Sequence, residues 1–557
     1  MARLDRLGPA LLTAQTGAVI GREFSHALLA AVMQVPEAVL NGSLDRLTQA
    51  GLLFRQGVPP HAIYFFKHAL VRDVAYGTLL RESRRAIHAR IAEVFESRFA
   101  EIAENQPEVL ARHYTEAGLI EEAVRQWGKA GQRSLERSAL IEAAGQLKRA
   151  LTQIATLPAT PTLRREEIRL QVALINALVH VNGFASAETK AAVERARLLI
   201  EQAEAYGEPP EDPLVLFSVM YAAMVPSFVT FNFDAVREAV AQFLALAEKQ
   251  GQTGALTIAH RVAGIRLLCT GDLRQGRAHL DRAIAIYDPV AHLPLATRFG
   301  QDSRVAALSY RAIALWMLGN PNAAIADANE ALFDAREIGH AASLIYALSI
   351  TSFSHLLCGN YATANAQLGE AVALAEEKGA LFWKTTATVL SGCVSAATGN
   401  ALDAVDIIGS AVTAFRSTGA TVWMPSYLSY LASAHAELGR FDDAWRCTKE
   451  AMAIIGTSKE TWFEAEINRV AGEIALRSPH RDPEKAEGYF KRALTVARMQ
   501  QAKSLELRAA ISMARLLRDR DRRHAVRTLL PVYKRFSEGF DTVDLNNAKA
   551  LLGELGT

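Results

Sequence analysis

Apolar residues recur along most of the chain with the spacing of amphipathic helices, and glycine interrupts them at regular intervals. In the middle of the chain a glycine returns every forty residues, an alanine follows it by five residues, and a second alanine follows by twelve. These are Gly319, Gly359, Gly399 and Gly439, then Ala324, Ala364, Ala404 and Ala444, and finally Ala331, Ala371, Ala411 and Ala451. A second glycine series, Gly339, Gly379 and Gly419, lies midway. Each unit therefore predicts two helices of about seventeen residues, each ended by a glycine.

The alanines have a steric explanation, because only a small side chain lets the two helices of a hairpin approach closely. The run Gly-Asn-Tyr-x-x-Ala-x-x-x-Leu-x-x-Ala from Gly359 to Ala371 resembles the tetratricopeptide repeat, in a variant longer than the usual length of about thirty-four residues. Weaker copies continue the pattern on both sides. We therefore predict an all-α fold, an α-solenoid of tetratricopeptide-like helical hairpins with a period of about forty residues.

The regularity of this pattern divides the chain into four expected parts. Residues 1–100 lack the period and predict three helices followed by a β-hairpin, which is the order of a winged-helix module. Residues 101–290 indicate degenerate hairpins, residues 291–535 regular repeats, and residues 536–557 a C-terminal capping helix. A proline-containing loop over residues 288–300 is long enough to be a joint in the array.

A winged helix suggests DNA binding, but the charges of its third helix oppose that function. Residues 36–50 contain Glu37 and Asp45 and a single cation, Arg46, so this helix would approach DNA with a net negative charge. The formal charge of the whole chain is only +2, from 61 basic and 59 acidic side chains, so no general field attracts nucleic acid or an anionic membrane. Neither is an expected partner.

One motif near the N-terminus carries a second resemblance. Residues 66–80, Phe-Lys-His-Ala-Leu-Val-Arg-Asp-Val-Ala-Tyr-Gly-Thr-Leu-Leu, are similar to the region after the nucleotide-binding module in bacterial signal-transduction ATPases of the STAND class. More narrowly, the chain resembles the C-terminal part of proteins that join a class III adenylate/guanylate cyclase domain, an AAA-like ATPase, a winged helix and tetratricopeptide repeats. Shorter matches are residues 21–24, residues 113–118 and the run Gly-Phe-Asp-Thr-x-Asp-Leu at 539–545.

The resemblance implies a role for His68, as the winged-helix histidine that contacts the phosphates of a nucleotide held by the neighbouring module. The alternative is that His68 caps or packs at the junction of hairpin and helix. The sequence has no GxxxxGK[ST] loop and no cyclase-like domain, so we expect no enzyme activity, no catalytic residues, no cofactor and no metal. Met1 stands where the ATPase ends in the longer relatives, so the chain is expected to be either a separate product that acts with an ATPase in trans or a fragment.

The cysteines and the apolar segments indicate in which cellular compartment the protein is expected. Cys269, Cys358, Cys393 and Cys447 lie far apart and in helical patterns, so we expect small buried side chains and neither a zinc site nor a disulfide framework. The first residues are too charged for a secretory signal, and the cytoplasm is the expected location. Residues 214–233 are the most membrane-like segment, but proline and hydroxyl residues interrupt them, and a buried helix is expected.

Two groups of residues are candidates for ligand contact on the repeat surface. Trp383, Trp423 and Trp462 stand about one repeat apart and would form an aromatic ladder, unless they are one packing position repeated. Glu466 and Arg469 would line a polar pocket, unless they belong to a solvated helix face.

The sequence therefore favours a non-catalytic tetratricopeptide scaffold or sensor in bacterial signalling. It would bind a protein or peptide on its inner surface and regulate an ATPase or cyclase module absent from this chain. Two alternatives stay open: a fragment of an adenylate cyclase or ATPase with nucleotide-dependent activity, and a winged-helix transcriptional regulator.

Overall fold

The computed structural model describes residues 8–183, 186–208 and 212–556, whose regular secondary structure is helical apart from three short strands. The chain divides into two compact units. Unit 1 comprises Met1–Arg133 and Glu142–Leu170, and unit 2 comprises Ser134–Ile141 and Gln171–Thr557. The finer division into four parts at residues 100, 290 and 535 stays a prediction drawn from the sequence pattern.

Unit 1 begins with the three helices and the hairpin that its sequence predicts. The elements are α1 (Ala10–Ile20), β1 (Glu23–Ser25), α2 (His26–Met33), α3 (Glu37–Gln49), β2 (Leu53–Gln56) and β3 (Ile63–Phe66). The short strand β1 was not predicted; it pairs with β3, so the antiparallel sheet has the order β1-β3-β2. Phe24 reaches the core from β1 and stacks on Tyr64. The assignment of this arrangement to the winged-helix class stays a prediction.

Helices complete the rest of unit 1. They are α4 (Ala69–Gly77), α5 (Arg81–Arg98), α6 (Ala100–Asn105), α7 (Pro107–Ala117), α8 (Ile120–Glu136), α9 (Leu140–Ile154) and α10 (Pro161–Val181), of which the ends of α8 and α10 and the start of α9 belong to unit 2.

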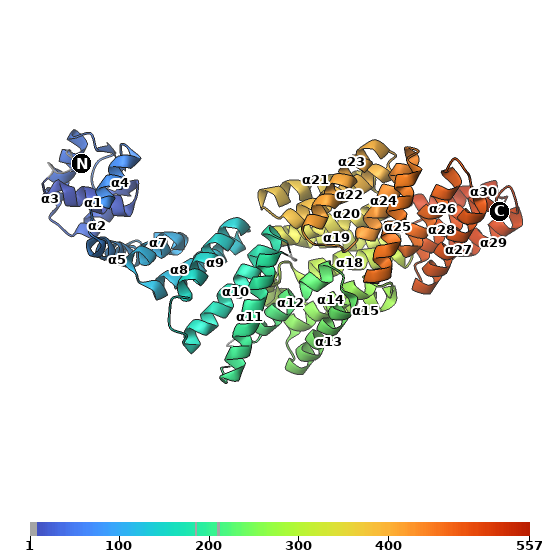
Figure 1. The fold of residues 1–557 in the computed structure, drawn as a ribbon, viewed down its shortest axis with the longest axis horizontal. Helices are drawn as coiled ribbons and strands as arrows, with labels where there is room; N and C mark the ends of the chain where they lie inside the picture. Colours follow the sequence, from blue (N-terminus) through green and yellow to red (C-terminus); the bar gives the residue numbers. More distant parts are fainter. Residues whose placement is uncertain (1–7, 184–185, 209–211, 557) are drawn as a thin grey trace. The chain divides into compact units, whose positions relative to one another are not determined.

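Unit 2 is an array of helical hairpins, in which we name the helices of each pair the first and the second helix (Figure 1). Before the regular repeats come α11 (Ala187–Ala205), α12 (Leu214–Val229), α13 (Phe233–Gln250), α14 (Thr253–Cys269) and α15 (Leu273–Ala285). The predicted joint consists of three short helical segments, α16 (Pro289–His292), η1 (Leu293–Leu295) and α17 (Ala296–Phe299).

The regular hairpins follow this joint. They are α18 (Ser303–Met317) with α19 (Pro321–Ile338), α20 (Ala341–Cys358) with α21 (Tyr361–Glu377), α22 (Leu381–Ala397) with α23 (Ala401–Ser417), α24 (Met424–Glu437) with α25 (Phe441–Ser458), α26 (Glu464–Arg477) with α27 (Pro483–Gln500), and α28 (Lys503–Leu517) with α29 (Arg522–Tyr533), closed by α30 (Val543–Glu554).

The residues that define the sequence period have the predicted structural roles. The glycines of both series have positive φ, from 67° to 89°, and stand just after helices. The alanines of both series are buried, and most have no exposed surface. Each second helix packs against its own first helix and the next one, while consecutive first helices form an inner layer. The predicted fold class, an α-solenoid of tetratricopeptide-like hairpins, is confirmed.

The ends of several first helices make contacts that the repeat pattern in the sequence does not predict. The carbonyl of Val229, at the end of α12, accepts hydrogen bonds from the backbone N–H groups of Thr421 and Val422, just before α24, at 2.8 and 2.9 Å. The carbonyl of Cys269, at the end of α14, accepts from the N–H of Trp462, just before α26, at 3.2 Å. In both cases the end of a first helix meets the beginning of the first helix five hairpins later.

The same spacing recurs at the two following hairpins. Ser504, at the start of α28, donates from its hydroxyl to the carbonyl of Trp316 in α18 at 2.5 Å. Gly359, after α20, lies so near Val543 of α30 that an added Cβ would stand 2.5 Å from Cγ2 of that valine. Successive turns of the array therefore touch, and the inner layer becomes a packed core instead of an open groove. An open inner surface was expected, and this contact between turns limits it to the cavities described below.

Apolar helices lie in this core. Contrary to expectation, the one helix of the described residues that is long and apolar enough to cross a bilayer is α20, and most of it is buried in the protein. The segment 214–233 forms a shorter helix, α12, which ends at Val229. All four cysteines are buried, as predicted, and their thiols are free.

Candidate functional site

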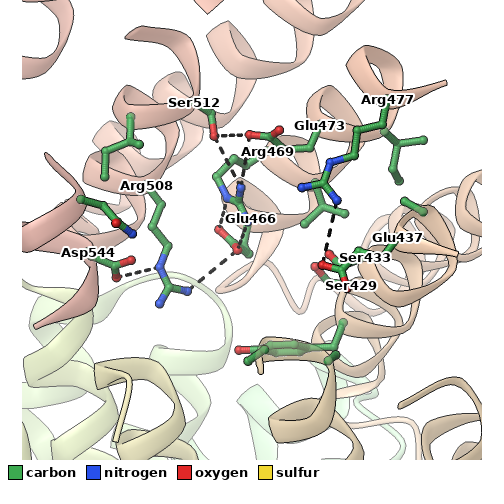
Figure 2. A pocket seen from close by; sticks show the side chains of 18 of the residues that line it. Ser429, Ser433, Glu437, Glu466, Arg469, Glu473, Arg477, Arg508, Ser512 and Asp544 are labelled. Atoms are coloured by element: carbon green, nitrogen blue, oxygen red, sulfur yellow. Dashed lines mark hydrogen bonds and ion pairs between the residues drawn. The ribbon is translucent and has the colours of Figure 1, made fainter. Parts of the chain in front are cut away.

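A cavity of about 320 Å³ lies among the last hairpins of unit 2. The helices α24, α26 and α28 supply most of its wall, and α30 closes one side through Asp544 and Asn547. The ends of α20 and α22 supply a smaller apolar part with Leu356, Ala396 and Ala397. Figure 2 shows acidic, basic and hydroxyl side chains that converge on this space from different helices. We refer to it as the polar pocket.

Arg508 holds the C-terminal helix against the array. Its Nε lies 2.8 Å from Oδ2 of Asp544, its Nη2 donates to the carbonyl of Leu357 at 3.0 Å, and its guanidinium lies 4.8 Å from the ring centre of Trp316. Only 17% of the Arg508 side chain is exposed. An arginine so placed joins α20, α28 and α30, so its first role is structural.

Glu466 and Arg469, both candidates from the sequence, lie in the wall of the polar pocket. Arg469 donates two hydrogen bonds to the Glu466 carboxylate, at 2.9 and 2.7 Å, while Glu473 accepts from the hydroxyl of Ser512 at 2.7 Å (Figure 2). Burial alone would raise the pKa of Glu466, but the charges of Arg469 and Arg508 and the hydrogen bonds from Arg469 hold that pKa below its ordinary value. Both side chains therefore stay charged, and their contact with a ligand remains a prediction.

Two arginines at the rim of the polar pocket are more exposed and have weaker ion pairs or none among the described residues. Arg477 is half exposed, and its only ion pair among the described residues is a long one, 4.0 Å, to Glu437. Arg515 is exposed and has no ion pair within 4.0 Å among the described residues. The hydroxyls of Ser429 and Ser433 lie in the same wall (Figure 2). The base of the pocket is thus internally neutralised, while its rim offers two guanidinium groups to an anionic group.

The three tryptophans occupy the core of unit 2. Trp383, Trp423 and Trp462 are 5%, 9% and 2% exposed, and Trp383 packs edge-on against Tyr346 with ring centres 4.9 Å apart. Their burial favours the packing alternative, and contact of these rings with a ligand stays a prediction. Trp423 and Trp462 also border an apolar cavity of only about 20 Å³, room for little more than a water molecule.

Glu460 lies beside these rings and has no exposed surface. Its Oε1 accepts from the N–H of Trp423 at 2.8 Å and from Nε1 of Trp462 at 2.9 Å, while its Oε2 has no partner. Burial raises the pKa of this carboxyl to about 8, against the two hydrogen bonds, which lower it. The carboxyl is therefore protonated in the folded protein at neutral pH.

His68 stands at the predicted junction between β3 and α4. It is the N-cap residue of α4, with extended backbone angles, and its side chain is exposed and makes no capping hydrogen bond. The imidazole is thus accessible, and its contact with a nucleotide of another module remains a prediction. Among the described residues no group of three or more His, Cys, Asp or Glu side chains could hold a metal ion.

Sequence reasoning missed most of the polar pocket. Arg508, Asp544 and Glu473 come from three helices, and each looks like one charged residue in an amphipathic pattern. A weak signal exists: Arg508 stands among the apolar residues of α28 that face the core, where an unpaired cation would be costly. This position indicates a partner from another helix, though not which one.

No protein-family model matches the chain. An uncharacterized protein of Rhizobium meliloti (strain 1021) is 27% identical over 358 residues, which are 63% of this chain and 34% of that protein. The chain thus spans about a third of the length of this relative.

Solved structures with similar helix stacking include three proteins that are each 12% identical to this chain. A Rap protein complexed with Competence and Sporulation Factor has a TM-score of 0.46 at 12% identity over 70% of this chain and 99% of that chain. A STAND protein with a tetratricopeptide repeat sensor from Pyrococcus horikoshii has a TM-score of 0.31 at 12% identity over 98% and 64%. Yeast Tom70 has a TM-score of 0.31 at 12% identity over 84% and 96%. No functional conclusion follows from this likeness.

Proposed function

We propose that the chain is a non-catalytic scaffold that binds a protein or peptide, and that the polar pocket is where an acidic group of that partner is held. The observation that carries the proposal is the pair of rim arginines, Arg477 and Arg515, above a wall whose other charges already pair with one another. A carboxylate meets such guanidinium groups with charge-assisted hydrogen bonds.

The size of the pocket supports a side chain or chain end as the bound group. Its volume of about 320 Å³ is at the lower limit of sites that enclose a drug-sized ligand. In the described part of unit 2 the turns pack on one another, which leaves little room for an extended peptide along the inner layer. A partner would therefore place an aspartate, a glutamate or its C-terminal carboxylate in the pocket and spread over the surrounding helix ends.

A peptide-display selection with the full-length chain tests this proposal. Enriched peptides should share an acidic residue or a free C-terminus, and Arg477→Glu with Arg515→Glu should raise their Kd at least tenfold because four units of charge change at the rim. The matched control, Lys449→Glu with Lys534→Glu, changes the same charge at exposed residues outside the pocket and should leave Kd within twofold. Selection of no common sequence, or equal weakening by the control, would argue against the pocket.

We further propose that the partner belongs to an ATPase or cyclase module supplied in trans, in the cytoplasm. The motif at residues 66–80 and the exposed imidazole of His68 support this role, and the four unpaired thiols fit a reducing compartment. The test is ATP hydrolysis by a STAND-class ATPase module with and without this chain, followed by His68→Ala. An unchanged rate in the presence of the chain would contradict the regulatory role and leave peptide binding untouched.

A further inference from the structure

A second, larger cavity of about 570 Å³ lies between two turns of unit 2. One side comes from α15, with Arg274 and Arg277, and from the end of α18. The other side comes from the end of α27, the first turn of α28 and Arg535, which follows α29. The contact between turns five hairpins apart is therefore what creates this space. We refer to it as the basic cavity.

Cations dominate the lining of the basic cavity. Five basic side chains face two acidic ones, which leaves a net charge of +3, larger than the formal charge of the whole chain. The basic side chains are Arg274, Arg277, Arg498, Lys503 and Arg535, and the acidic ones are Asp281 and Glu506. The polar pocket, in contrast, is lined by four acidic and four basic side chains.

The two carboxylates of the basic cavity are already shared. Glu506, of whose side chain only 5% is exposed, forms ion pairs with Arg498, at 2.8 Å, and with Arg535. Asp281 pairs with Arg311 of α18 at 2.9 Å and with Arg277 at 3.5 Å. Each carboxylate thus holds two guanidinium groups. The group of Glu506, Arg498 and Arg535 retains one positive charge, whereas Arg311 also pairs with Asp327 at 2.6 Å, so the cluster around Asp281 is neutral.

Two further cations have no acidic partner. Among the described residues neither Arg274 nor Lys503 forms an ion pair within 4.0 Å. Lys503 is the first residue of α28, a helix of 15 residues whose N-cap, Ala502, offers no capping side chain. The positive end of the helix dipole therefore adds to the charge of Lys503 at the cavity wall.

We propose that the basic cavity binds a small phosphate-bearing anion. A diphosphate carries several negative charges and many acceptor oxygens, which arginine and lysine bind through multiple charge-assisted hydrogen bonds. The half-exposed guanidinium groups of Arg277, Arg498 and Arg535 surround the opening while their carboxylate partners keep them in place. The volume also admits a nucleotide. Because the cavity joins two turns, a bound anion would stabilise their contact.

The test uses the full-length chain with inorganic pyrophosphate and, separately, with ATP in the absence of Mg²⁺. Pyrophosphate should raise the melting temperature beyond the effect of sodium chloride at equal ionic strength, because a ligand that binds the folded state stabilises it. Arg274→Glu with Lys503→Glu should raise Kd at least tenfold, and higher salt should weaken binding. A larger effect of ATP would indicate a nucleotide, and an equal effect would indicate that phosphate alone is recognised.

The matched control is Arg523→Glu with Lys449→Glu, the same change of charge at exposed residues that do not line the basic cavity. It should retain pyrophosphate binding within twofold. Stabilisation no greater than that by chloride, equal loss in the control, or binding of polyglutamate but not of pyrophosphate would overturn the proposal. Peptide binding at the polar pocket is measured independently, so the two proposals fail separately.

Discussion

Glu460 shows how one buried side chain ties neighbouring hairpins together. The loops before α24 and α26 both reach its Oε1, and Trp462, which donates to it, also donates its backbone N–H to Cys269 of the preceding turn. Three groups near enough for Glu460 to influence them, Cys269, Tyr310 and Tyr427, have pKa values raised mainly by burial and stay neutral. No cation of the described residues pairs with this carboxyl, and protonation removes the charge that burial disfavours.

Glu460→Gln should remove a pH-dependent loss of stability. The pKa of a glutamate is near 4.5 in the unfolded chain and about 8 for Glu460 in the folded protein, so folding takes up a proton between these values. Stability from this group is therefore complete below pH 4.5 and is lost as the pH rises toward 8. We expect the stability advantage of the variant over the wild type to grow by ~3–4 kcal/mol between pH 5 and pH 8.

Urea unfolding at pH 5, 6.5 and 8 measures this difference. The buried histidines have lowered pKa values and change stability in the opposite direction, but they are common to both proteins and cancel in the comparison. Parallel curves for variant and wild type would show that Glu460 is ionised in the folded state.

At the scale of helices, two glycines with the same backbone conformation have different surroundings. Gly359 and Gly399 have φ of 86° and 84° and occupy the same position of successive repeats. An added Cβ would lie 2.5 Å from Val543 at the first and would meet nothing within 4 Å at the second. The pair separates the cost of the left-handed conformation from the cost of the contact between turns.

Gly359→Ala should destabilise the protein more than Gly399→Ala does. Both should lose about 1 kcal/mol for an alanine at positive φ. The first should lose a further ~1–3 kcal/mol because the methyl group overpacks against Val543. Denaturant unfolding gives both values, and the addition of Val543→Ala to Gly359→Ala should restore most of the difference. Equal losses in the two single variants would mean that the turns do not press on each other.

The sequence predicted helices well because their signals are local. The glycine and alanine periods fixed the order of hairpins, the left-handed caps and the close crossings, and the apolar character of residues 62–67 fixed a strand of the N-terminal hairpin. It could not predict β1, because three residues are too few to show an alternating pattern. Nor could it show which of several similar charged residues meet, since Arg508 and Asp544 belong to different helices.

At the scale of the molecule, the contact between turns joins residues about two hundred positions apart. The Oε1 atom of Glu538 accepts from the N–H groups of Asn322 and Ala323, at 3.0 and 3.2 Å, and so caps α19 from the next turn. No local pattern encodes such a pairing, because it depends on how far each hairpin rotates relative to the one before it. The sequence thus predicted an open inner surface where the structure has a core.

Glu538→Ala should lower the protection of the start of α19 from hydrogen exchange and leave the starts of the other second helices unchanged. Loss of this cap should cost about 1 kcal/mol and speed hydrogen exchange at Asn322 and Ala323. Glu538→Gln keeps an acceptor oxygen and should behave more like the wild type. Exchange at the start of α23 serves as the internal reference. Unchanged protection at Asn322 would show that the turns separate in solution.

The five-hairpin spacing also restricts how this array can change in length. A hairpin added at an end leaves existing partners in place, whereas one inserted between α20 and α24 would place the end of α14 against the start of α24 instead of α26. Glu460 and Trp462 would then lose Cys269, and the basic cavity would lose one of its walls. Internal duplication, the ordinary route by which repeat proteins lengthen, is therefore costly in this chain, and new hairpins are tolerated at its termini.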